Sequence, residues 1–178
     1  MTNMQIIDNF MRDEWPKHIH NLLDGHEFPW YLYKQTSYDE DGYQQMVHTF
    51  YRDNTIASNH FLALQPLIYE LERQTSYQVK RTDRIKANLL FNRSITEEQK
   101  QKVIHSDMEV PNYVSLIYYV KDSDGDTVFY DDDKKTELMR VKPKANRVVI
   151  FDSRIWHTGE LPVENQSRIV ISGIYEVK

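Results

Sequence analysis

The sequence predicts a mainly β protein, a β-sandwich or jelly roll with helices packed beside it. Short apolar strands, separated by turn residues, follow one another in the second half of the chain, at 114–120, 126–130, 136–142, 147–152, 156–160 and 167–177. The chain also contains 12 tyrosines, and aromatic side chains fit the pleated, half-buried surface of a sheet.

The composition indicates one globular domain. The 178 residues are enough for one hydrophobic core and too few to expect two, and 40% hydrophobic with 28% charged residues is typical of a soluble chain. No internal repeat, low-complexity tract or linker divides the sequence. We therefore expect a single domain over residues 1–178, in which residues 1–83 give helical and aromatic support to a core over residues 84–178.

Composition also argues against several classes of site and location. The chain has no cysteine, so a bound metal must use nitrogen and oxygen ligands. No apolar run reaches the roughly 18 residues of a transmembrane helix, and the first residues lack the features of a signal peptide. We therefore expect a cytoplasmic location. The net charge of −5 argues against non-specific binding to nucleic acids.

Residues 3–24 are expected to form an amphipathic helix. Apolar residues recur there at steps of three and four, Asp24-Gly25 supplies a stop signal, and Pro16 should kink the helix or split it in two. His18 and His20 are two residues apart, so on a helix they would point to different sides and would not form a metal-binding pair.

Two strands, a loop and a second helix are expected next. Residues 28–33, Phe-Pro-Trp-Tyr-Leu-Tyr, predict an aromatic strand, residues 34–45 a polar loop, and residues 46–51 a short strand. A second amphipathic helix is expected over about 59–74, with its first turn delayed by Pro66.

The strand expected over residues 77–91 alternates polar and apolar side chains, and two registers are open. If the apolar positions 85, 87 and 89 pack against the helices, the alternate side chains point into the interior, where polar groups need partners and so indicate the wall of a site. Those side chains are Arg84, Lys86, Asn88 and Leu90. In the other register they point into solvent. Further on, Thr96 and Gln99 form a helix N-cap signature, which predicts a short surface helix or lid.

Two histidines and one carboxylate are the candidate metal ligands. His105 and Asp107 are two residues apart, so in an extended segment their side chains point to the same side. His157 follows the apolar run 147–151, and Arg168 opens another apolar strand, where it could neutralise an anionic co-substrate. Two histidines with one carboxylate form the facial triad of non-haem Fe(II) oxygenases. A lone His-x-Asp is weak evidence, so the prediction rests on the combination.

Around these residues, the sequence resembles the 2-oxoglutarate- and Fe(II)-dependent oxygenases, and among them the prolyl-hydroxylase-like branch of bacterial and phage type. Residues 114–120 are similar to the strand of that branch that ends in a Tyr-Tyr or Tyr-Leu pair. Residues 125–129, Gly-Asp-Thr-Val-Phe, resemble its Gly-Gly-x-Thr-x-Phe hairpin, and residues 141–147 resemble its Pro-Lys-x-Gly-x turn. Asp126 and Asn146 replace glycines of these motifs, and both residue types tolerate positive φ.

The resemblance covers about residues 84–177 and implies a double-stranded β-helix, a cupin-like jelly roll. It implies Fe(II) held by His105, Asp107 and His157, with 2-oxoglutarate and O2 as co-substrates and ascorbate as a stimulant. The implied reaction converts 2-oxoglutarate to succinate and CO2 and hydroxylates an unactivated C–H bond, with the iron centre as catalyst and no separate acid or base.

The far carboxylate of 2-oxoglutarate must be paired when it is buried, and Arg168 is its expected partner. The resemblance places Tyr119 and Ser172 beside it, and Asn88 could add a hydrogen bond if its strand has the inward register. Candidates for the substrate pocket are Lys86, Arg84, Trp30, Tyr33, His48, Tyr51 and Trp156. Lys86 or Arg84 could meet an acidic substrate group, whereas each aromatic candidate could instead fill the core or line a loop.

Two other classes of protein stay open. A cupin-like metal enzyme that does not use 2-oxoglutarate is one, and Arg168 with Tyr119 and Ser172 argues against it. A non-catalytic β-sandwich binding module is the other, and the complete set of metal ligands argues against it. The substrate, whether peptidyl, amino acid or small molecule, is not determined, because fold analogy is a poor guide to substrate. Oligomeric state and closure of loop 34–45 also stay open.

Overall fold

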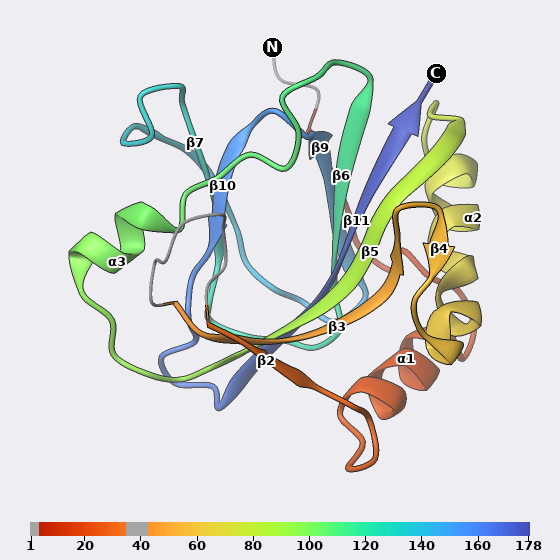
Figure 1. Cartoon of the computed structure of the whole chain (residues 1–178), viewed down its shortest axis with the longest axis horizontal. Coiled ribbons are helices and arrows are strands. Elements are labelled where there is room, and N and C mark those ends of the chain that lie inside the picture. Colours follow the sequence, from red (N-terminus) through yellow and green to blue (C-terminus); the bar gives the residue numbers. More distant parts are fainter. Residues whose placement is uncertain (1–3, 35–42) are drawn as a thin grey trace.

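The computed structural model describes residues 4–34 and 43–178, and the strands in these residues form two antiparallel sheets (Figure 1). The strands of the large sheet are β1 (Gln5–Ile7), β2 (Tyr31–Tyr33), β3 (Gln45–Arg52), β4 (Thr55–Ile56), β5 (Val79–Phe91), β6 (Tyr113–Tyr119), β9 (Arg147–Asp152) and β11 (Ser167–Val177). Those of the small sheet are β7 (Thr127–Tyr130), β8 (Glu137–Val141) and β10 (Trp156–Gly159).

The large sheet runs in the order β1-β9-β6-β11-β5-β3-β2, with β4 paired to β3, and the small sheet runs β10-β7-β8. Buried side chains from both sheets pack together between them, among them Ile117 on β6, Phe129 on β7 and Val170 on β11. The predicted double-stranded β-helix is confirmed. The N-terminal 83 residues supply four of the strands of the large sheet, so they form part of the core as well as its support.

Helices cover the outer face of the large sheet. Figure 1 shows α1 (Trp15–Leu23) and α2 (Gln65–Gln74) on that side, while α3 (Glu97–Lys102) lies across the molecule from them. Buried side chains of α1 and α2 pack against Ile85, Ala87 and Leu89 of β5. Because side chains alternate along a strand, this packing sends the intervening residues of β5 toward the small sheet. The inward register of this strand is therefore the correct one.

The expected helix over residues 3–24 is wrong in its first half. Gln5–Ile7 is strand β1, which pairs with Val148–Ile150 of β9. Asn9 and Asp13 have positive φ angles of 53° and 58°, which no helix contains, so the chain turns twice before α1 begins. Pro16 occupies the first turn of α1, where a missing N–H costs nothing, so it starts the helix rather than kinking it.

The other elements differ less from expectation. The aromatic strand is shorter, since only Tyr31–Tyr33 is extended. The second helix is divided into a 3₁₀ turn, η1 (Asn59–Leu64), and α2, with Pro66 in the first turn of α2. In α3 the predicted cap is confirmed, because the side chain of Thr96 accepts from the N–H of Gln99 and the Gln99 side chain accepts from the N–H of Thr96.

Residues 35–42, which make up most of the expected loop 34–45 and its possible closure over the site, lie outside the described residues. None of the helices in the described ranges combines the length and the apolar character needed to cross a bilayer.

Candidate active site

The three predicted metal ligands meet at one point. One ligand atom from each of His105, Asp107 and His157 lies within 4.8 Å of the others. The loop after α3 and strand β10 are held together by a backbone pair, in which the N–H of His105 donates to the carbonyl of His157 at 3.0 Å and the reverse bond measures 2.8 Å. The N–H of Asp107 donates to the carbonyl of Ser153 at 2.9 Å. These bonds fix residues that are about 50 positions apart in the sequence.

Both imidazoles present the same nitrogen to the centre of the group. Nδ1 of His105 lies 2.9 Å from the carbonyl oxygen of Val103, and Nδ1 of His157 lies 2.9 Å from that of Ile155. A carbonyl only accepts, so each Nδ1 carries the proton and each Nε2 keeps a lone pair for a metal. Burial, with the neighbouring His157, lowers the pKa of His105 to about 4, so its imidazole is neutral at physiological pH.

The carboxylate of Asp107 is oriented by two donors. The hydroxyl of Ser115 donates to Oδ2 at 2.7 Å, and Nη2 of Arg84 donates to Oδ1 at 3.0 Å. Burial alone would raise the pKa of Asp107, but the surrounding groups, His157 and Arg84 foremost, outweigh it and hold the pKa below its usual range. Two imidazoles and an ionised carboxylate are donors that suit Fe(II), so this group fits that metal.

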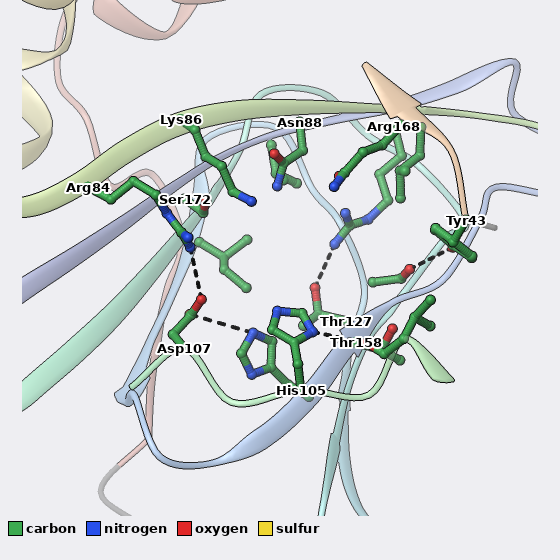
Figure 2. A pocket seen from close by; sticks show the side chains of 17 residues that line it. Tyr43, Arg84, Lys86, Asn88, His105, Asp107, Thr127, Thr158, Arg168 and Ser172 are labelled. Carbon is green, nitrogen blue, oxygen red and sulfur yellow. Dashed lines mark hydrogen bonds and ion pairs between the residues drawn. The ribbon is translucent and has the colours of Figure 1, made fainter. Parts of the chain in front are cut away.

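The three ligands lie on the wall of a pocket between the two sheets (Figure 2). Four of the residues that line the pocket are the inward-pointing residues of β5, and three more are on β11. The lining comprises Tyr43, Gln45, Arg84, Lys86, Asn88, Leu90, Val103, His105, Asp107, Ile117, Thr127, His157, Thr158, Gly159, Arg168, Val170 and Ser172.

Arg168 is buried at one end of this pocket and is firmly held. Its Nε donates to the carbonyl of Gly125 at 2.7 Å, and its Nη2 donates to Oγ1 of Thr127 at 2.7 Å. Its side chain is 3% exposed, and among the described residues no carboxylate forms an ion pair with it. A buried guanidinium without a counter-ion is costly, so the site is suited to an anionic ligand.

Thr127 is a pocket residue that the sequence reasoning missed. Its Oγ1 accepts from both Arg168 and the hydroxyl of Tyr119, each at 2.7 Å. These two bonds use both acceptor positions of a hydroxyl, so the hydrogen of Thr127 is left to donate, and the residue lines the pocket. Thr127 is the threonine of the Gly-Gly-x-Thr-x-Phe resemblance, which is the signal that could have identified it.

Tyr119 does not line the pocket, in contrast to the expectation that it touches 2-oxoglutarate. Its ring is fully buried in the cluster between the sheets, with the guanidinium carbon of Arg168 5.8 Å from the ring centroid. Its hydroxyl donates to Thr127, which does line the pocket. Ser172 and Asn88 do line the pocket, as expected.

Two of the aromatic candidates lie on the helix side of the large sheet. His48 pairs with Ala87, whose side chain faces the helices, and its ring nitrogens lie 2.7 Å from the carbonyl oxygen of Pro29 and 2.8 Å from the hydroxyl of Ser58. A register shift between Thr49 and Tyr51 pairs Tyr51 with Ile85 and turns it to the same side.

The other three aromatic candidates also lie outside the pocket. Trp30 packs against the helix-side core, and its indole N–H donates to the carbonyl of Leu23 at 3.3 Å. Tyr33 is 44% exposed on the edge strand β2. Trp156 precedes His157 and therefore points away from it, with Nζ of Lys134 3.6 Å from its ring centroid. None of the five aromatic candidates therefore lines this pocket, and the alternative that they fill the core or lie in other parts of the surface applies.

Three buried polar atoms near the pocket have no hydrogen-bond partner among residues 4–34 and 43–178: Arg84 Nε, Asn88 Oδ1 and Ser172 Oγ. All three residues line the pocket, and Figure 2 shows Asn88 across it from His105, while the guanidinium of Arg84 extends to Asp107. Buried polar groups in folded proteins are almost always paired, so these atoms are positioned for a polar ligand.

Comparison with known proteins identifies the class. The family model of the 2OG-Fe(II) oxygenase superfamily matches residues 89–176. The fold is similar to that of a prolyl-4-hydroxylase from Pseudomonas putida, at 14% identity and a TM-score of 0.64, covering 99% of this chain and 94% of that one.

Two further structures are similar over most of their length. A prolyl hydroxylase from Trichoplax adhaerens, in complex with a peptide fragment of hypoxia inducible factor, is 12% identical at a TM-score of 0.65, covering 97% of this chain and 83% of that one. HygX from Streptomyces hygroscopicus, with nickel and 2-oxoglutarate bound, is 12% identical at a TM-score of 0.66, covering 98% and 83%. The comparison with curated protein sequences gave no match.

The match to the 2OG-Fe(II) oxygenase superfamily covers 88 of the 178 residues and includes His105, Asp107, His157 and Arg168. Together with the fold, it supports an enzyme of the oxygenase class that uses Fe(II) and 2-oxoglutarate.

Proposed function

We propose that the chain is a hydroxylase in which His105, Asp107 and His157 hold Fe(II) and Arg168 binds the far carboxylate of 2-oxoglutarate. One observation carries this proposal: the Nε2 atoms of two histidines and an ionised carboxylate converge in a pocket that also contains a buried guanidinium without an ion-pair partner among the described residues. When bound, the iron supplies the oxidation, in which 2-oxoglutarate and O2 give succinate and CO2 and one oxygen atom enters a C–H bond of the substrate.

The protein's own residues bind and orient the co-substrate. The guanidinium of Arg168 is a planar fork that suits a carboxylate, and its bonds to Gly125 and Thr127 fix the plane of that fork. The free hydrogen of the Thr127 hydroxyl adds a donor beside it. Asn88, on the neighbouring strand β5, offers its side-chain amide toward the same pocket. Ser115 and Arg84 keep the carboxylate of Asp107 in place whether or not a metal is bound.

The substrate class is an open part of the proposal. The similar structures include a prolyl-4-hydroxylase and a prolyl hydroxylase bound to a peptide fragment, which supports a peptidyl or amino-acid substrate, but small-molecule substrates fit the same fold. We also propose that the enzyme acts in the cytoplasm and does not bind nucleic acids. Both statements are predictions from the sequence.

Succinate formation tests the function. The purified chain with Fe(II), 2-oxoglutarate and ascorbate should release succinate, slowly without substrate, and His105→Ala should reduce the rate at least a hundredfold because one of three ligands is lost. Calorimetric titration with Mn(II), without oxygen, should show the same loss of metal binding. His18→Ala, an exposed histidine on α1, is the matched control and should behave as the wild type.

Each outcome has a clear meaning. Metal binding without any turnover of 2-oxoglutarate would point to a cupin-like metal enzyme of another kind. Equal metal binding by the wild type and His105→Ala would contradict the assignment of the ligands.

A further inference from the structure

The pocket has a second cationic end. Arg168 occupies one end, while Arg84 and Lys86 extend from β5 at the other, on the side of Asp107 (Figure 2). Arg168 is on β11, where it pairs with Leu90 of the neighbouring strand β5. Leu90 is four residues from Lys86 along β5. Four residues of a strand span about 13 Å, so the two ends are separate binding positions.

The charges at the second end do not balance. Arg84 donates to Asp107, which compensates one of the two cations, and no acidic side chain other than Asp107 lines the pocket among the described residues. The ammonium group of Lys86 forms no ion pair or hydrogen bond with any described residue. Bound Fe(II) and the two carboxylates of 2-oxoglutarate carry equal and opposite charges, so occupation of the iron site leaves the imbalance in place. At this end of the pocket, one positive charge therefore remains without a partner among the described residues.

Two further properties of this end support a missing anion. Burial lowers the pKa of Lys86 to about 7, with a further contribution from Arg84 that exceeds the opposite one from Asp107, so the ammonium group is incompletely compensated. Ser172, whose Oγ is buried and unpaired, is the β11 partner of Lys86 and provides a hydroxyl at the same level of the pocket.

We propose that the substrate carries a carboxylate, which binds to Lys86 with help from Arg84 and Ser172 and so places the carbon to be oxidised beside the metal ligands. This inference rests on the proposed function and adds the chemical class of the substrate. A carboxylate supplies one negative charge, which matches the one ammonium group, that of Lys86, at this end of the pocket. The metal ligands lie between the two cationic ends, so a substrate anchored at Lys86 and a co-substrate anchored at Arg168 both reach the metal.

Ligand binding in the absence of turnover tests the proposal. The protein is loaded with Mn(II) and saturating 2-oxoglutarate without oxygen, and the probes are propionate and its neutral isostere propionamide. Paramagnetic broadening of the probe's proton signals by Mn(II) reports binding close to the metal. We expect saturable broadening of propionate and little of propionamide, with propionate bound at least tenfold more weakly by Lys86→Met.

Two matched variants and the co-substrate serve as controls. Lys86→Arg keeps the charge and should stay within about threefold of the wild type, and Lys80→Met removes an exposed lysine of the same strand and should have no effect. The methylene signals of 2-oxoglutarate report the first site independently. They should broaden in Lys86→Met as in the wild type and should not broaden in Arg168→Met.

Several results would overturn the inference. Equal propionate binding by Lys86→Met and the wild type, equal binding of propionamide, or tighter binding of methylphosphonate would each contradict the carboxylate site. Loss of 2-oxoglutarate binding in Lys86→Met would assign Lys86 to the co-substrate instead. If 2-oxoglutarate is not broadened in the wild type, the proposed function itself fails, and this inference fails with it.

Discussion

The position of the Arg168 guanidinium depends on a neighbour that has no side chain. A Cβ atom on Gly159 would lie 2.9 Å from Nη1 of Arg168 and 3.2 Å from its guanidinium carbon. The guanidinium cannot move aside without giving up its bonds to Gly125 and Thr127. Because residue 159 is glycine, there is space for the guanidinium of Arg168, the proposed partner of the far carboxylate of 2-oxoglutarate.

Gly159→Ala should raise the KM for 2-oxoglutarate roughly tenfold, because displacing Arg168 breaks at least one buried, charge-assisted hydrogen bond. Metal affinity should change little, since the metal ligands are untouched. The measurement is succinate formation against 2-oxoglutarate concentration. In an Arg168→Lys background the guanidinium atoms that meet the new methyl group are gone, so the same substitution should there have a much smaller effect.

Residue chemistry explains which parts of the site could be predicted. His105, Asp107, His157 and Arg168 could be found because their types and spacing point to one kind of chemistry. Thr127 was missed, because its role arises from two hydrogen bonds that form only after β6, β7 and β11 come together. The aromatic candidates were misplaced because a ring's side of a sheet depends on register.

At the scale of elements, the strands after residue 105 were predicted within about one residue at each end, because turn residues separate them. The N-terminal segment was not. Its apolar spacing is compatible with a helix, and the pairing of Gln5–Ile7 with β9 involves residues more than 140 positions away, which no local pattern records. Likewise, the shift that turns Tyr51 toward the helices arises where β3 pairs with β5.

Asn146 links this N-terminal segment to the turn before β9. Its φ of 61° is the left-handed conformation expected for a residue that replaces glycine. Its side chain also donates to the carbonyl of Met11 at 2.9 Å and accepts from the N–H of Met11 at 2.8 Å. One residue therefore combines the turn with the attachment of the segment that leads into α1.

Substitutions at Asn146 should separate these two contributions. Asn146→Gly keeps the backbone conformation and loses the side-chain bonds, which should lower the free energy of unfolding by about 1–3 kcal/mol. Asn146→Ala adds the cost of a left-handed alanine, about 1 kcal/mol more. Urea unfolding measures both, and a glycine variant less stable than the alanine variant would contradict this account. Asn54, exposed with a φ of 59°, is the control, and Asn54→Gly should cost little.

At the scale of the whole molecule, the site reduces the stability of the fold that contains it. The pocket holds two cations at one end and a buried guanidinium at the other, balanced among the described pocket residues only by Asp107. Such an arrangement persists because the surrounding sheets are stable enough to tolerate it, and it should show as an unusual dependence of stability on pH.

The pKa of Lys86 predicts the sign of that dependence. Burial lowers it from 10.5 to about 7 in the folded chain, so between these pH values the unfolded chain binds the extra proton and the folded chain does not. The free energy of unfolding should therefore rise with pH between about 7 and 10.5, by a few kcal/mol at most, because of this residue. Below pH 7 the gain is absent. In Lys86→Met this contribution is absent.

Urea unfolding of the metal-free wild type and Lys86→Met, at pH 7 and pH 9.5, measures the effect. The methionine variant should be the more stable at pH 7, and its advantage should shrink at pH 9.5, whereas Lys80→Met should show no such trend because that lysine is exposed. A difference between the two proteins that does not change with pH would mean that Lys86 keeps its ordinary pKa. A ligand carboxylate beside Lys86 would restore the proton, so saturating propionate should stabilise the Mn(II)- and 2-oxoglutarate-loaded wild type and leave Lys86→Met unchanged.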